Sequence, residues 1–414
     1  MRHPRRIAPA LGLLFFVLVV LAIRPAALRA HTVSVAPPDQ LGKVNFPTSC
    51  VADVQPTIEK GVALLHSFQY KESEQMFTEA AKRDPKCAMA YWGKAMIHAT
   101  DRPELAAEGL EAARHYAAIA PDSAHALHMP SHIFVRLGLW QDSINSNIAA
   151  NTSGAHAAEM HLAESHYQTH AMDFLSYSYL QSGQEAKARE VIEHTDHVVG
   201  ASEESKAEHR AYFTARTALE LHRWKEAAAL PVPATRKEWL DTVYWARAIG
   251  AARSGDVTGA ETDVKELTQL VAGREKRARK EGYGVSNEKA TDLREAEAWL
   301  AFAKGNPDEA LQELRAAADH QDKNGGESVS VPAREMLADM LLELKRPAEA
   351  LAEYKIVLKN SPNRFDGLLG AARSAQATSD AGDAQSFYAK LAEICGPGAD
   401  RPELTEAKTY LAQK

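Results

Sequence analysis

A chain of 414 residues is longer than one ordinary hydrophobic core supports, so it must form several domains or an array of units that pack on their neighbours. Aromatic residues make up 7% of the chain, and no long run alternates apolar with polar residues, which favours helices over strands. The formal net charge of −7 offers no general attraction for nucleic acid or for an anionic membrane surface. We therefore predict an all-α fold and no nucleic-acid partner.

Residues 1–30 have the pattern of a signal peptide. They begin with the basic stretch MRHPRR, continue with an apolar run over 10–23, and lead through small residues to Ala30. The apolar run is short for a bilayer crossing, and Arg24 follows it at once. We predict that this segment is cleaved, which leaves no stable membrane span, and that the mature protein is periplasmic or secreted. A signal-anchored membrane protein is the alternative.

A helix–turn–helix pattern begins at residue 53, after an N-terminal segment over 31–52 that we expect to be extended. In GVALLHSFQYKESEQMFTEAAKRDP, Gly61 and Leu64 share one face of a first helix, and Phe77 and Ala80 share one face of a second. The same frame returns in EMLADMLLELKRPAEALAEYKIVLKNSP, and weaker copies lie between the two. The pattern resembles the tetratricopeptide repeat (TPR), a unit of about 34 residues.

The repeats predict an α-solenoid of about nine helix pairs, closed by a capping helix in RPELTEAKTYLAQK. We expect an N-terminal TPR array over 53–154, a histidine-rich central array over 155–271, and a C-terminal array with its cap over 291–414. A charged insertion over 272–290, which contains GREKRARKEGYG, is predicted to be a solvated helix extension. Stacked helix pairs of this kind build a superhelix with a concave groove.

Five stretches carry a more specific resemblance. In chain order they are LLHSFQYKESEQMF, DPKCAMAYWGKAM, HALHMPSHIFVRLGLW, HAMDFLSYSYLQSG and PAREMLADMLLE. Together they look like a family of exported bacterial tetratricopeptide-repeat proteins of uncharacterised function, and the similarity covers nearly the whole mature chain. The resemblance implies the solenoid fold and export, and it implies no particular activity.

The chain has three cysteines, whose spacing alone leaves their pairing open. Cys50 and Cys87 both lie just before the first helices of successive repeats, and therefore at equivalent ends of neighbouring units. The two reach disulfide range if the loops that hold them curl toward each other. We predict a Cys50–Cys87 bridge in an oxidising compartment, with Cys395 left free.

Histidines are concentrated in the middle of the chain, where 12 of the 17 fall between residues 115 and 222. In HALHMPSHIF, the repeat frame assigns Leu127 and its helical neighbours to the packed face. His125, His128 and His132 then form a second stripe, which in a tetratricopeptide repeat faces the concave groove. The same stripe on the next two first helices holds His170, Asp173 and Tyr177, then His209, Tyr212 and Arg216.

Three hypotheses account for these histidines. In the first, they are polar groove residues that form hydrogen bonds between helices. In the second, His128, His132, His170 and Asp173 form a metal site, because two imidazoles at i and i+4 plus two ligands from the next helix make a nitrogen and oxygen set suited to zinc. Pro130 interrupts the helix between the first two and is expected to kink it.

In the third hypothesis the cluster is catalytic, with a histidine as general base and Ser131, Tyr177 or a metal-bound water as the nucleophile. The chain contains neither H-E-x-x-H nor G-x-S-x-G, and no glycine loop that would hold a phosphate. We therefore assign no catalytic residue and no certain cofactor, and we lean against an enzyme.

The function that the sequence favours is an exported scaffold that binds a protein segment or a small ligand in its concave groove. Stacking and charge-assisted hydrogen bonds would hold such a partner. The alternative is a metal-binding protein or a metal-dependent hydrolase that uses the groove histidines. The predicted partner-binding residues are His125, Trp92, Tyr177, Tyr212 and Arg216.

Overall fold

The computed structural model describes residues 44–66, 69–99, 106–119, 121–162, 165–235, 240–280, 289–323, 329–396 and 398–413. The predicted signal peptide over 1–30 lies outside the described residues, as does 31–43 of the segment that we expected to be extended. The described residues of that segment, 44–52, form neither helix nor strand.

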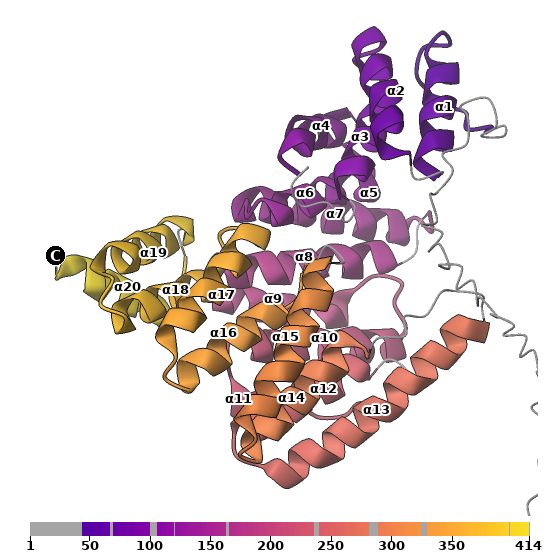
Figure 1. The fold of residues 1–414 in the computed structure, drawn as a ribbon. Coiled ribbons are helices and arrows are strands. Elements are labelled where there is room, and N and C mark those ends of the chain that lie inside the picture. The colour runs from indigo at the N-terminus through magenta and orange to yellow at the C-terminus, as the bar shows by residue number, and fades with distance from the viewer. Residues whose placement is uncertain are drawn as a thin grey trace, which may run out of the picture. The chain divides into compact units, whose positions relative to one another are not determined.

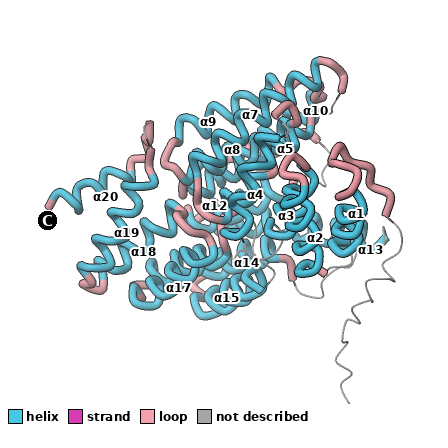
Figure 2. Tube along the Cα trace, turned by 90° about the horizontal axis from the view of Figure 1, so that it is seen from above, coloured by secondary structure: helices cyan, strands magenta, loops and turns pink. Residues whose placement is uncertain are grey.

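The described part of the chain consists of helices joined by loops and contains no strand, which confirms the all-α prediction (Figures 1 and 2). None of these helices combines the length and the apolar character that a membrane crossing requires. The helices are α1 (Gln55–His66), α2 (Tyr70–Arg83), α3 (Ala88–Ala99), α4 (Ala106–Ile119), α5 (Ala124–His128), α6 (Pro130–Arg136), α7 (Trp140–Glu159), α8 (His166–Gln181), α9 (Glu185–His194), α10 (Glu203–Glu220), α11 (Trp224–Ala228), α12 (Asp241–Arg253), α13 (Val257–Lys280), α14 (Thr291–Ala303), α15 (Pro307–Lys323), α16 (Ala333–Glu343), α17 (Pro347–Asn360), α18 (Phe365–Ala377), α19 (Ala381–Ile394) and α20 (Glu403–Ala412).

Consecutive helices pack in pairs, as the repeat pattern predicts. Among the described helices, α1 packs on α2 and α3 on α4, α5 and α6 together pack on α7, and the pairing continues to α18 with α19. These make nine pairs, and α20 packs on α19 as the predicted cap. The first helices of neighbouring pairs also contact one another, as α8 does with α10, α10 with α12, and α12 with α14.

Glycine allows the close helix approach in the first repeats. The ring of the fully buried Phe77 on α2 lies against Gly61 on α1 and Gly93 on α3. A Cβ atom added at Gly93 would lie 2.4 Å from that ring, closer than any real contact. The predicted packed positions Leu64 and Ala80 are buried as well, so the repeat frame identified the core of this region correctly.

The first helix of the third pair is interrupted at Pro130, as predicted. Helix α5 ends at His128, and Pro130 is the first residue of α6. Proline has no backbone N–H, so the hydrogen bond to the carbonyl of Ala126 is missing there. The break separates the helical turns that carry His128 and His132.

The charged insertion begins as the end of a long helix. Helix α13 has 24 residues and continues to Lys280, which confirms a helix extension for the first part of 272–290. Arg274 in this extension contacts Asp241 at 2.6 Å and Asp292 at 3.2 Å. Residues 281–288 lie outside the described part of the chain, and the array boundaries at 154, 271 and 290 remain predictions.

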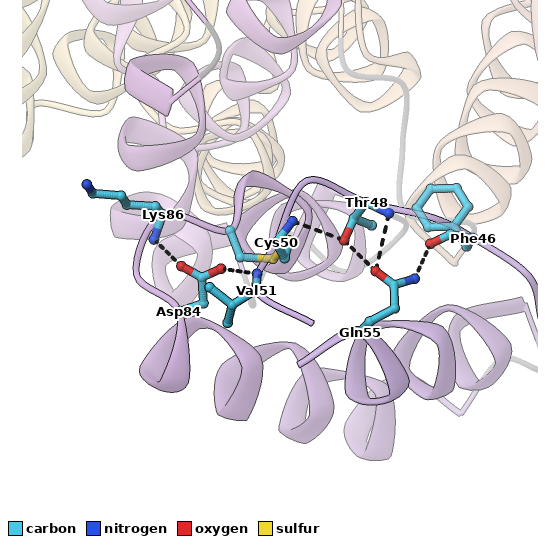
Figure 3. The surroundings of a disulfide bond; sticks show 8 residues. Phe46, Thr48, Cys50, Val51, Gln55, Asp84 and Lys86 are labelled. Carbon is cyan, nitrogen blue, oxygen red and sulfur yellow. Dashed lines mark hydrogen bonds between the residues drawn. A yellow bond between two sulfur atoms is a disulfide. The ribbon is translucent and has the colours of Figure 1, made fainter. Parts of the chain in front are cut away.

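The predicted disulfide is confirmed. Cys50 and Cys87 are bonded, with their Cα atoms 4.7 Å apart, and Cys395 is a free thiol. Figure 3 shows how the surrounding loops meet: the backbone N–H groups of Val51 and Lys86 both donate to the carboxylate of Asp84, at 2.9 and 3.1 Å. The bridge therefore joins the loop before α1 to the loop before α3.

A buried ionic cluster joins the central array to the C-terminal array. Arg364, just before α18, is fully buried and donates to Glu335 on α16 at 2.7 Å. It also donates to Glu220 on α10 at 2.8 Å and to the hydroxyl oxygen of Tyr177 on α8 at 3.0 Å. One side chain thus connects elements that lie 144 and 187 residues away along the chain.

A second set of contacts secures the same junction. The carboxylate of Asp400 accepts from the backbone N–H groups of Glu185 and Ala186, the first residues of α9, at 2.6 and 3.0 Å. The neighbouring Arg401 is buried and forms an ion pair with Asp366 at 2.9 Å. The loop before α20 therefore caps a helix that lies more than two hundred residues earlier in the chain.

Candidate functional site

Two adjoining hollows lie along the first helices of the central array. The larger, which we call the histidine hollow, has a volume of about 530 Å³ between α8 and α10. It is lined by His166, Thr169, His170, Asp173, Glu208, His209, Tyr212 and Phe213. Side chains of neighbouring first helices therefore meet here, as the stripe pattern predicts.

The second, which we call the arginine hollow, has a volume of about 380 Å³ between α10 and α14. Its lining includes Arg216 on α10, Trp245 on α12 and Arg274 on α13. The indole N–H of Trp245 donates to Glu295 at 2.8 Å, which holds the ring in place. Tyr212 lines both hollows, so the two form one groove across four neighbouring first helices, α8, α10, α12 and α14.

An ion pair stands at the junction of the hollows. Arg216 donates to the carboxylate of Asp173 and, at 2.9 Å, to the hydroxyl oxygen of Tyr212. The guanidinium and the carboxylate are 10% and 16% exposed, so each neutralises the other away from bulk water. Asp173 is thus the partner of an arginine, and it lies outside the group of histidines with which we expected it to bind metal.

Three histidines converge beside the histidine hollow, as predicted. Nε2 of His128 lies 3.0 Å from Nε2 of His132, and the ring centroids of His128 and His170 are 4.4 Å apart. Nδ1 of His128 lies 2.7 Å from Oδ1 of Asn147 on α7. The ring of Phe174 packs against all three imidazoles.

One part of the expected orientation is wrong. His128 is 3% exposed and points between α7 and α8, because it lies at the end of α5, where the break at Pro130 turns it inward. His132 is half-buried and His170 is exposed, so the cluster runs from the interior to the surface. His125 is exposed, lies beside Tyr167, and lines neither hollow.

The cluster is electrically neutral near pH 7. Burial, together with the neighbouring imidazoles, lowers the pKa of His128 to about 2. Burial, together with His170, His125 and Arg136, lowers the pKa of His132 to about 4. Burial also lowers the pKa of the more exposed His170. All three rings therefore keep one nitrogen lone pair free of a proton.

Two predicted partner-binding residues need correction. Tyr177 is 3% exposed, packs on Trp140, and accepts a hydrogen bond from Arg364. Burial raises its pKa to about 12, so it is neither a groove residue nor a nucleophile. Trp92 packs between Phe46 and Phe77 in the first repeats and lines neither hollow.

The sequence analysis also missed residues of the groove. Glu208, Trp245 and Arg274 line it, and continuing the groove stripe to the helix over 241–253 would have found the tryptophan. Asn147, which the sequence analysis did not single out, is fully buried on α7. A buried asparagine needs a hydrogen-bond partner, so an asparagine at a packed position in the sequence indicates that a polar side chain lies beside it.

The comparisons with known proteins agree with the repeat frame. The family model described as "Tetratricopeptide repeat" matches residues 59–124 and 295–365. No curated protein matches the chain.

The solved structures that are similar to this chain include the following three, at 15–16% identity. A tetratricopeptide-repeat protein from Parabacteroides merdae has 15% identity and a TM-score of 0.37, over 70% of this chain and 97% of that one. The TPR domain of P58(IPK) has 15% identity and a TM-score of 0.25, over 87% and 99%. Human IFIT1, in a dimer with m7Gppp-AAAA, has 16% identity and a TM-score of 0.33, over 83% and 72%.

The helix pairs and the matched repeat model define the class: the described part of the chain is an all-α solenoid, with tetratricopeptide repeats matched over residues 59–124 and 295–365. Proteins built from this repeat are scaffolds for protein interactions, and we assign this chain to that general role.

Proposed function

We propose that this protein is an exported scaffold that binds an extended segment of another protein in the groove formed by the histidine and arginine hollows. A small ligand is the alternative occupant. The observation that carries the proposal is that two hollows of about 530 and 380 Å³ share Tyr212 and together extend over consecutive first helices. A continuous groove across several repeats suits a chain segment better than a compact ligand.

The charges of the groove indicate the chemistry of the segment. Five carboxylates and two guanidiniums line the two hollows, and burial lowers the pKa of His170, which favours its neutral form. This excess of negative charge favours a segment that carries lysine or arginine. Tyr212 offers an aromatic face at the centre, where a cation or an apolar side chain would pack.

We expect Tyr212→Ala to weaken the binding of such a segment at least tenfold, because the ring lies where the two hollows join. The probe is a lysine-containing 15-residue peptide selected from a random displayed library on the wild-type protein. Its dissociation constant is measured by fluorescence polarisation for each variant. Tyr91→Ala is the matched control, since Tyr91 is a half-buried tyrosine on α3 that lines neither hollow. Equal affinities of the wild type and Tyr212→Ala would reject the groove.

Export is supported by the signal-like pattern of residues 1–30 and by the Cys50–Cys87 disulfide, a bond that persists in oxidising compartments. We expect the mature protein to begin near His31 and to appear in the periplasmic or secreted fraction. Terminal sequencing of the protein from each cell fraction checks this. An intact Met1 in the membrane fraction would show a retained anchor instead.

A further inference from the structure

Three imidazoles of different helical segments present nitrogen atoms to one another. One ring nitrogen each of His128, His132 and His170 lies within 4.8 Å of the other two. The residues come from α5, α6 and α8, so the tertiary fold, and not a single helix, brings the third histidine in.

Asn147 determines which nitrogen of His128 carries the proton. The side-chain N–H₂ of Asn147 donates to the carbonyl oxygen of Ser143 at 2.8 Å, which leaves Oδ1 facing the imidazole. An amide oxygen only accepts hydrogen bonds, so Nδ1 of His128 must donate to it. Nε2 of His128 is therefore unprotonated, and its lone pair points at His132.

His128 and Asn147 are arranged like a metal-binding histidine and the residue that accepts a hydrogen bond from its second ring nitrogen. Histidines that bind metal through one nitrogen usually donate a hydrogen bond from the other to an oxygen, which fixes the ring and its tautomer. Here the supporting oxygen belongs to Asn147, which is fully buried and whose amide nitrogen donates to Ser143.

The spacing also suits one ion. Two nitrogens bound to a tetrahedral Zn²⁺ at bond lengths of 2.0–2.1 Å lie about 3.3 Å apart. The Nε2 atoms of His128 and His132 are 3.0 Å apart, and the exposed ring of His170 has room to adjust. We propose that His128, His132 and His170 bind a zinc ion, with the fourth position taken by water.

Binding exchanges one interaction for others without a net proton change. Without metal, the contact between the two Nε2 atoms requires His132 to donate its Nε2 proton to His128. With Zn²⁺, both nitrogens face the ion, and His132 carries its proton on Nδ1 instead.

A second cluster of possible metal ligands differs from the three-histidine cluster because its charges are already compensated. Ligand atoms of His222, Glu335 and Asp366 also lie within 4.8 Å of one another. Arg364 and Arg401 already neutralise the two carboxylates, at 2.7 and 2.9 Å. A cation added there would duplicate charges that are present, whereas the three-histidine cluster contains no cation and its imidazoles are neutral.

The proposal is tested on the full mature chain without a histidine tag, stripped of metal and titrated with Zn²⁺ in a calorimeter. We expect one equivalent to bind with a dissociation constant below about 1 µM. His170→Ala removes an exposed ligand without opening the interior, and we expect it to lose at least a hundredfold in affinity. His156→Ala is the matched control, since that histidine is exposed on α7 away from the cluster, and it should bind as the wild type does.

A second variant tests the role of the asparagine. Asn147→Ala keeps all three ligands but removes the acceptor for Nδ1, and we expect it to lose about 10- to 100-fold in Zn²⁺ affinity. Co²⁺ replaces Zn²⁺ as a spectroscopic probe, and the wild type should show the visible bands of a four-coordinate ion that His170→Ala lacks. If the wild type binds no Zn²⁺ in the micromolar range, or if His170→Ala binds as tightly as the wild type, the site does not exist.

Discussion

Arg364→Met is expected to lower the free energy of unfolding by about 3–5 kcal/mol. The wild-type guanidinium is fully buried and is shared by the carboxylates of Glu220 and Glu335, which are also buried. Its removal leaves the two buried carboxyl groups without a cation, so each either stays an uncompensated charge or must take up a proton. Urea denaturation followed by circular dichroism measures the loss, and we expect the unfolding midpoint to move to lower urea.

Two further variants distinguish this charge effect from general damage. Adding Glu220→Gln and Glu335→Gln to Arg364→Met removes both uncompensated charges, and we expect it to recover at least half of the lost stability. Arg346→Met breaks a solvent-exposed pair with Glu349 and should leave the midpoint nearly unchanged. If the triple variant is no more stable than Arg364→Met, the ionic account of the cluster is wrong.

Glu335→Gln is expected to remove a pH dependence of stability between about pH 5 and pH 8. Burial raises the pKa of Glu335 to about 8, and the negative charges of Asp366 and Asp339 add to the rise, against the lowering effect of Arg364. A folded pKa above the ordinary value of 4.5 means that the folded state binds the extra proton in this window. The wild type should therefore lose stability as the pH rises from about 5 to about 8.

The measurement is the free energy of unfolding at several pH values for the wild type and Glu335→Gln. The amide has no proton to lose, so its curve should be flatter over this range, and the two curves should diverge as the pH falls below 8. Glu349→Gln is the control, because the pKa of Glu349 is lowered by Arg346 and its titration falls below the window. Parallel curves for the wild type and Glu335→Gln would show that Glu335 is ionised throughout.

This cluster also bears on the candidate site. Glu220 and Tyr177 lie on α10 and α8, the two helices that line the histidine hollow, and Arg364 connects both to the C-terminal array. A rigid groove loses less conformational entropy when it binds a segment. The contacts that join distant repeats therefore hold in place the helices that carry the proposed binding groove.

The repeat frame determined much of the site because it is local. The spacing of small and large residues indicates which residues pack within a helix pair, and neighbouring first helices must then lie side by side. The convergence of His128, His132 and His170 follows from this rule and was predicted. The disulfide followed from the same equivalence of repeat ends, because Cys50 and Cys87 precede the first helices of successive units.

The errors came from contacts that cross many repeats. Tyr177 occupies a groove position in the local frame, but Arg364 and Trp140 bury it. A periodic pattern describes a helix and its immediate neighbours, and it contains no information about a residue 187 positions away. Asp173 was misassigned for a different reason: Arg216, on the neighbouring first helix, forms an ion pair with its carboxylate.

The sequence by itself therefore determined the helix pairs, their order, the likeness to tetratricopeptide repeats and the pairing of Cys50 with Cys87. These properties depend on hydrophobic periodicity and on contacts between adjacent units, and short stretches of the sequence are enough to determine both. Only the tertiary structure decided which polar side chains are buried, that Asn147 orients His128, and that Arg364 joins α8, α10 and α16. Those properties depend on which distant segments of the chain meet in the fold. A buried charge is stable only when a partner from such a segment compensates it.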